Sequence, residues 1–292
     1  MKKFLNARVK GFLGRTHALL SVMLFCICML IPADFFQTTI GMMKNEVPFF
    51  IVGLIVLIGG ALLPDLDNGQ SSAGATLGPL GSICTTFMQS ISSIFWTMLH
   101  GKGDKMPPSQ HRYFWHTLIC SAGIFCLFYF GMPASDNTLI TSIQKSEDIT
   151  TWLQYNAILI LFIILIFMAI LVGSNMLISK LVTLFKSSKL KFLNYILPVA
   201  ACIYIFFIDI SHLKILGMCI GMGYFFHCLE DCFADSGVPF LWPIPIKNQM
   251  WKRIRLTPIT IQTGGLANTI LDIIILVIDI GLIVLLVSGG KL

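Results

Sequence analysis

The sequence has few charged residues. Asp, Glu, Lys and Arg make up 12% of the 292 residues and hydrophobic residues make up 56%, whereas a soluble domain carries about 25% charged residues. This composition excludes an ordinary soluble domain, and the length fits one membrane domain. The net charge of +6 therefore gives no indication of nucleic-acid binding. We expect it to set membrane topology and to favour anionic lipid headgroups.

Three short motifs are also absent. The nine cysteines form no Cys-x-x-Cys pair and mostly lie in apolar runs, so we expect no disulfide framework. No His-Glu-x-x-His occurs, which argues against an intramembrane metalloprotease of that type. A basic N-terminus precedes an apolar run, as in a signal peptide, but no small-x-small cleavage site follows. We therefore expect an uncleaved first span.

Seven apolar segments approach the length of a transmembrane helix, which is about 20 residues. They cover residues 18–33, 47–63, 113–132, 152–179, 192–208, 213–230 and 266–287. Residues 79–99 alternate Ser and Thr with large apolar side chains, which predicts an interfacial or re-entrant helix. The fold class expected is all-α, a polytopic transmembrane helix bundle with about seven spans; six or eight spans are the alternatives.

The basic residues predict the orientation of this bundle. With the N-terminus inside, sixteen of the twenty Lys and Arg residues fall on the inner side. Five of them precede the first span, and the others lie in loops 64–112, 180–191 and 231–265. Cytoplasmic loops carry such an excess of Lys and Arg. The sequence therefore predicts a cytoplasmic N-terminus.

The same topology places a set of histidines and aspartates at one membrane face. They are His17, Asp65, Asp67, His111, His116, His227 and Asp231. The topology was assigned from Lys and Arg alone, so this shared level is an independent observation. Ionisable groups at a membrane are costly and usually functional. His and Asp from several helices are what a metal site in a helix bundle needs.

The spacing within the set suits metal binding, although each pair also has a structural explanation. Asp65 and Asp67 in an extended turn can point both carboxylates at one metal ion; alternatively the turn is solvated and caps a helix at Ser71-Ser72. His227 and Asp231 share one helical face at i, i+4 spacing, and a plain His–Asp hydrogen bond is the alternative.

His111 and His116 can face one pocket if His111 is pre-helical. An interfacial belt of Arg112, Tyr113 and Trp115 explains the neighbouring residues but not the two histidines. Arg112 offers a clamp for a phosphate or carboxylate. Glu230 lies on a different face of its helix from Asp231 and is a candidate general base or a supporting group. Arg112 and Glu230 are thus the candidate catalytic residues.

Two further acids lie inside the last span. Asp272 and Asp279 are seven residues apart and share a helical face. No Lys or Arg in another span offers an obvious partner. We expect them to hydrogen-bond within the bundle, or alternatively to mark a polar path.

The order of the motifs resembles a known family. Thr16-His17, Leu63-Pro64-Asp65-Leu66-Asp67, His111-Arg112 to His116, Gly223 through His227 to Asp231, and Gly237-Val238-Pro239 to Trp242-Pro243 follow one another. This order resembles the predicted membrane-bound metal-dependent hydrolases of bacterial inner membranes, whose best-known group is described as LexA-regulated. It is more distantly similar to the all-helical zinc-dependent phospholipases C. Asn68 stands where that family has a ligand histidine.

The resemblance covers residues 16–120 and 220–246 of the single membrane domain. It leaves out the spans within 133–212, which are an apparent insert, and the last span. The loop from Gly237 to Pro245 is proline-rich and apolar, and we expect it to cover the site and touch lipid.

These observations predict an integral membrane metal-dependent hydrolase. His17, Asp65, Asp67, His111, His116, His227 and Asp231 are the expected ligands of one or two divalent ions. Zn is the first candidate, and Mn, Fe and Mg are alternatives. The ion would activate a water at the cytoplasmic interface, against a lipid-like phosphoester or ester. We expect a bacterial inner-membrane location and membrane lipids, but no nucleic acid, as partners.

The alternatives are a metal-ion or proton transporter that uses the same His/Asp cluster, and a non-catalytic adaptor with a structural metal. The substrate, the metal and the oligomeric state are left open by the sequence.

Overall fold

The computed structural model describes residues 14–31, 41, 46–105, 111–131, 138–145, 148–150, 152, 156–185, 192–234, 236–256 and 266–288. These residues are mostly helical, and they form no strand beyond isolated bridges. The basic residues before Gly14, which contributed to the predicted orientation, lie outside them.

Each of the seven predicted segments coincides with one helix. These are α1 (Gly14–Leu30), α3 (Val47–Leu62), α6 (Leu118–Gly131), α9 (Ala157–Phe185), α10 (Leu193–Ile205), α11 (Ile210–Asp231) and α12 (Leu266–Val287). Within the described residues, four stretches are long and apolar enough to cross a membrane: Val47–Asp67, Ala157–Ser179, Ile210–Asp231 and Thr269–Val287. The helices α1, α6 and α10 are apolar but shorter.

Five further helices among the described residues complete the architecture. The Ser/Thr-rich stretch forms the 20-residue helix α5 (Pro79–Met98). The others are the 3-10 helices η1 (Pro64–Asp67) and η2 (Phe114–His116), and the helices α4 (Ser72–Leu77) and α7 (Leu139–Gln144). Ser71 is the N-cap of α4, where its side chain accepts a hydrogen bond from the Gly74 amide, as the structural explanation of this turn expected.

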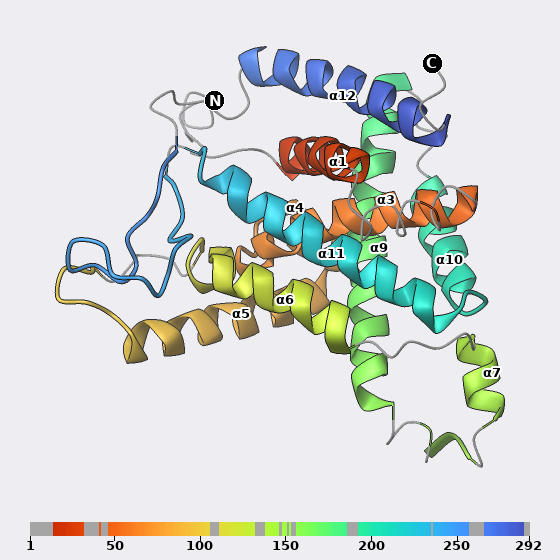
Figure 1. The fold of residues 1–292 in the computed structure, drawn as a ribbon, viewed down its shortest axis with the longest axis horizontal. Helices are drawn as coiled ribbons and strands as arrows, with labels where there is room; N and C mark the ends of the chain where they lie inside the picture. The colour runs from red at the N-terminus through yellow and green to blue at the C-terminus, as the bar shows by residue number, and fades with distance from the viewer. Residues whose placement is uncertain are drawn as a thin grey trace.

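The helices form a layered bundle that α9 crosses. Figure 1 shows α1, α3, α5, α6, α11 and α12 running roughly along one direction, with α9 passing across them. The centre of the core is α3, which packs against α11, α9 and α1. Close packing of α3 on α9 depends on glycine, because a Cβ atom on Gly59 or on Gly173 would overlap a carbonyl group of the other helix.

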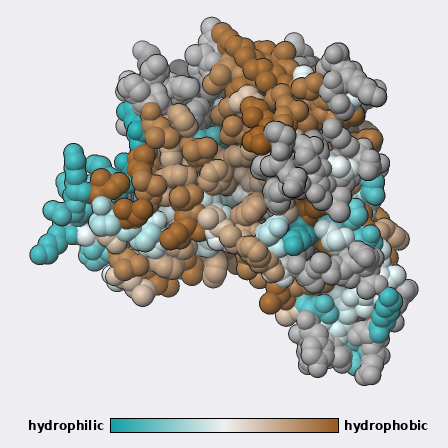
Figure 2. Space-filling model, viewed as in Figure 1, coloured by the Kyte–Doolittle hydropathy of each residue, from teal (hydrophilic) through white to brown (hydrophobic). Residues whose placement is uncertain are grey.

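The last helix lies on the outside, and its Asp272 makes polar contacts with α1. Large apolar side chains of α12 are exposed, and Figure 2 shows a mostly hydrophobic surface over this part of the molecule. Asp272 pairs with Arg15 (Nε–Oδ2 2.7 Å) and accepts a hydrogen bond from Thr16 (2.8 Å). The expectation that no Lys or Arg partners this acid was wrong. Arg15 precedes the predicted first span, but α1 begins at Gly14 and includes it.

Candidate metal centre

The structure brings all seven predicted ligand residues into one cluster. They come from α1, from η1 at the end of α3, from the turn and 3-10 helix that precede α6, and from the end of α11. Three overlapping groups have ligand atoms within 4.8 Å of one another. These groups are His17, His227 and Asp231; Asp65, His116 and His227; and Asp67, His111 and His116.

Four side chains meet at the centre of the cluster. His116 Nε2 lies 3.3 Å from His227 Nε2 and 3.4 Å from Asp231 Oδ2, and the last two atoms are 3.5 Å apart. Asp65 Oδ1 lies 3.9 Å from His116 Nε2 and 3.6 Å from His227 Nε2. Tetrahedral ligands of zinc, each about 2.0–2.1 Å from the ion, are about 3.3–3.4 Å apart. These four side chains therefore suit a zinc-sized ion.

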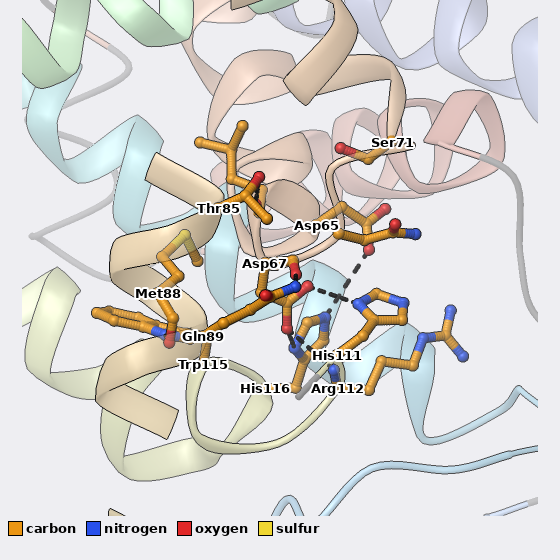
Figure 3. A network of polar contacts seen from close by, with 12 residues as sticks. Asp65, Asp67, Ser71, Thr85, Met88, Gln89, His111, Arg112, Trp115 and His116 are labelled. Carbon is orange, nitrogen blue, oxygen red and sulfur yellow. Dashed lines mark hydrogen bonds and ion pairs between the residues drawn. The ribbon is translucent and has the colours of Figure 1, made fainter. Parts of the chain in front are cut away.

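A second group surrounds Asp67, as Figure 3 shows. His111 Nδ1 lies 2.5 Å from Asp67 Oδ1, the Arg112 amide donates to Oδ2 (2.9 Å), and His116 Nδ1 is 3.6 Å from Oδ2. The expectation that His111 and His116 face one pocket is confirmed. Burial lowers the pKa of His111, but the hydrogen bond and negative charge of Asp67 outweigh it and leave that pKa raised.

The carboxylates are positioned by α5, which the sequence did not indicate. Asp65 and Asp67 lie on η1, a 3-10 helix that starts at Pro64 and not the extended turn that we predicted. Thr85 donates to the Leu66 carbonyl (2.6 Å) and Gln89 donates to the Asp67 carbonyl (2.8 Å). The spacing of Thr85 and Gln89, four residues apart on α5, is the only signal in the sequence that both face one partner.

Glu230 contacts His17 at the ring nitrogen that faces away from Asp231. Its Oε2 lies 2.7 Å from His17 Nδ1, and Ser21 donates to its Oε1 (3.3 Å). His17 Nε2 is thereby directed toward Asp231 Oδ1, 3.6 Å away. A carboxylate on the far nitrogen of a histidine fixes the tautomer and orientation of a metal ligand. This geometry favours the supporting role over the general-base role for Glu230.

Arg112 is the cation of the cluster. Its Nη2 pairs with Asp231 Oδ1 (2.8 Å) and its Nη1 donates to Ser236 (2.8 Å), at the start of the proline-rich loop. His17, Asp67, His116, His227 and Asp231 are fully buried. The cluster thus contains one guanidinium and four acids, which are Asp65, Asp67, Glu230 and Asp231. Buried charge of one sign is costly, so the donor set fits a divalent cation, and these residues are the ones that would hold it.

The comparison with protein families agrees with this architecture. A family model described as YdjM inner membrane protein matches residues 12–178 and 188–289. The chain belongs to the YdjM inner membrane protein family. No match was found among curated proteins or solved structures.

The match includes all seven residues of the cluster, α9 up to residue 178, and all of α12. It thus extends beyond residues 16–120 and 220–246, and between 12 and 289 it is interrupted only at 179–187. Together with the apolar helices, membership in this family places the protein in the inner membrane. The description of the family names neither an activity nor a metal.

Proposed function

We propose that this protein is a metal-dependent hydrolase of the inner membrane, acting on a lipid-like phosphoester or ester. The observation that carries the proposal is the convergence of Asp65, His116, His227 and Asp231 in a buried site. The two imidazole Nε2 atoms lie 3.3 Å from each other and 3.4–3.9 Å from an oxygen of each carboxylate. Three separate segments supply these side chains. A plain His–Asp hydrogen bond accounts for one imidazole beside one carboxylate, but it does not account for two Nε2 atoms 3.3 Å apart that both lie beside two carboxylates.

In this proposal the central four residues hold a divalent ion, with zinc first and Mn, Fe or Mg as alternatives. The ion would supply an activated water and polarise the ester. His17, Asp67 and His111 either hold a second ion or orient the first set. The Arg112 guanidinium, fixed by Asp231 and Ser236, has further N–H groups that can stabilise negative charge on a phosphoryl or acyl oxygen. Glu230 positions His17.

A lipid-like substrate is supported by an apolar cavity beside the cluster. The cavity has a volume of about 250 Å³ and is lined by side chains of α5, α6, α9 and α11 together with Leu66 and Trp115. Leu66 lies between Asp65 and Asp67, and Trp115 precedes His116. Phe87 and Leu127 line the cavity and are exposed on the outer surface. An apolar cavity of about 150 Å³ already binds a benzene-sized ligand, so this one suits an acyl chain.

We also propose the seven-span topology with a cytoplasmic N-terminus. It is supported by the coincidence of seven helices with the seven predicted segments and by the distribution of Lys and Arg. In this topology the cluster lies at the cytoplasmic interface, where the headgroup of an inner-leaflet lipid can reach it.

The test is metal analysis of the purified protein combined with hydrolysis assays on lipid phosphoesters. We expect stoichiometric divalent metal in the wild type and release of product that stops on chelation. The variant His212→Ala, which removes a histidine outside the cluster, should retain both properties. Absence of bound metal from the wild type would refute the proposal. Metal flux into proteoliposomes without hydrolysis would support transport instead.

Narrowing the apolar cavity should change chain-length preference. Ile124 lines the cavity, and we expect Ile124→Trp to reduce kcat/KM for a long-chain substrate by about tenfold or more, because lost apolar contacts cost that much. A short-chain, water-soluble analogue should be hydrolysed at the wild-type rate. Ile119→Trp, an exposed position on the same helix, is the matched control. Equal losses for both chain lengths would contradict an acyl-chain cavity.

A further inference from the structure

A second pocket lies outside the cluster. It has a volume of about 240 Å³ and is formed where the end of α5 and the loop after it meet the segment 249–253. Figure 1 shows these loops together at the left edge of the molecule, and Figure 2 shows hydrophilic residues gathered there beside a mostly apolar surface. None of the residues that line this pocket is one of the seven candidate ligands.

One carboxylate ties the two loops together. Asp104 accepts hydrogen bonds from the backbone amides of Gly101 (2.7 Å), Met250 (2.9 Å) and Trp251 (3.1 Å). Gln249 donates across the same junction to the Gly103 carbonyl (2.9 Å). The charge of Asp104 is therefore engaged by three amides of the protein. This pocket is a built feature and not a chance gap between loops.

Aromatic rings form the floor of the pocket. Trp96, Tyr113 and Trp251 are buried and lie against one another, with ring centroids 5.7–5.8 Å apart. Trp251 also donates to the Leu99 carbonyl (2.6 Å). Such a cluster is rigid, and tryptophan is the residue that membrane proteins place at the level of lipid headgroups.

Three cations surround this floor. Lys105, Lys252 and Arg253 line the pocket, and the guanidinium of Arg253 lies 5.1 Å from the centroid of the Tyr113 ring, a cation–π contact that fixes its place. Among the described residues no carboxylate forms an ion pair with any of the three. The undescribed neighbours 106–110 and 257–265 contain no Asp or Glu. The pocket is therefore positively charged.

We propose that this pocket binds the phosphate group of an anionic ligand, independently of the metal centre. The planar guanidinium of the arginine can donate two parallel hydrogen bonds to a phosphate, and each lysine ammonium adds a compact positive charge. The aromatic floor gives the pocket an apolar side for the carbon skeleton next to the phosphate. The same chemistry serves the headgroup of an anionic lipid and a free phosphate compound.

The pocket can be probed through its own tryptophans. Trp96 and Trp251 line it, so binding should change the intrinsic fluorescence of the detergent-solubilised full chain. We would titrate inorganic phosphate at constant ionic strength, and separately phosphatidylglycerol against phosphatidylcholine in mixed micelles. These titrations use the His116→Ala variant, so that phosphate binding at the metal centre does not contribute to the fluorescence change. Saturation by inorganic phosphate would indicate a free phosphate ligand, whereas saturation by phosphatidylglycerol alone would indicate a lipid headgroup.

Variants decide whether the signal comes from this pocket. Arg253→Ala and Lys252→Ala should each raise the dissociation constant about tenfold, the loss expected for one charge-assisted contact. The dissociation constant of Arg253→Lys should lie between that of Arg253→Ala and that of the parent chain. Lys247→Ala removes an exposed charge from the same loop outside the pocket and should bind like the parent. No saturable response to either probe, or equal responses in Arg253→Ala and Lys247→Ala, would overturn the proposal.

Discussion

Replacing His116 with alanine should reduce the bound divalent metal of the purified protein to background. Its Nε2 atom lies within 3.9 Å of ligand atoms from Asp65, His227 and Asp231, and its Nδ1 lies 3.6 Å from Asp67. No other imidazole in the cluster contacts all three aspartates. Elemental analysis after gel filtration measures the effect. A metal content equal to that of the wild type in His116→Ala would contradict the assignment.

Two comparisons separate ligation from general damage to the fold. Glu230→Gln keeps the size of the side chain but weakens its contact with His17, so we expect about a 10- to 100-fold lower metal affinity, as for other supporting groups. A ligand that binds only the folded state adds about 4 kcal/mol at a thousandfold excess over its Kd. Chelation should therefore lower the melting temperature of the wild type and of His212→Ala, but not that of His116→Ala.

Gly173→Leu should prevent accumulation of the folded protein. A Cβ on Gly173 would overlap the Ile55 carbonyl oxygen and lie 3.0 Å from the Gly59 amide nitrogen, both of them backbone atoms of α3. Backbone cannot move aside as a flexible side chain can, so we expect a loss of about 3 kcal/mol or more. The end of α3 carries η1, and displacement of α3 would also move Asp65 and Asp67. Size-exclusion chromatography and thermal unfolding in detergent measure the outcome.

The control for this substitution is Gly123→Leu on α6. A Cβ on Gly123 meets no atom within 4 Å, and the residue is exposed. We expect this variant to elute like the wild type and to melt at the same temperature or slightly above it, because glycine within a helix is about 1 kcal/mol less favourable than alanine. If Gly173→Leu behaved in the same way, α3 and α9 would not approach as closely as the structure shows.

The helices themselves were predictable because their signal is local. Each apolar segment coincides with a helix. In the lipid bilayer the backbone N–H and C=O groups have no water to bind, and a helix satisfies them all within one segment. The helix boundaries differ from the predicted ones where polar residues take part in packing. Arg15 and His17 belong to α1 because Asp272 and Glu230 on other helices pair with their side chains.

The grouping of the candidate ligands was also indicated by the sequence, because the distribution of Lys and Arg predicts a topology in which these residues share one depth. The depth of a residue in the membrane does not determine which residues of other helices lie beside it. Only the packing of α11 and η1 against the segment 111–116 brings His227, Asp65 and His116 within 4 Å of one another. The hydrogen bonds of Thr85 and Gln89 to η1 were not predictable, because they join backbone carbonyls to side chains of no unusual type.

The sequence by itself determined that this protein is a helical membrane protein, and it predicted that the His and Asp side chains lie at one depth. Composition, apolar length and basic-residue distribution carry that information, and none of them requires contacts between distant segments. The tertiary structure alone decided which side chains meet, which acid supports a histidine, and where a cationic pocket lies apart from the cluster. These features depend on the distances between helices, and close contacts such as that of Gly59 and Gly173 between α3 and α9 cannot be read from hydropathy.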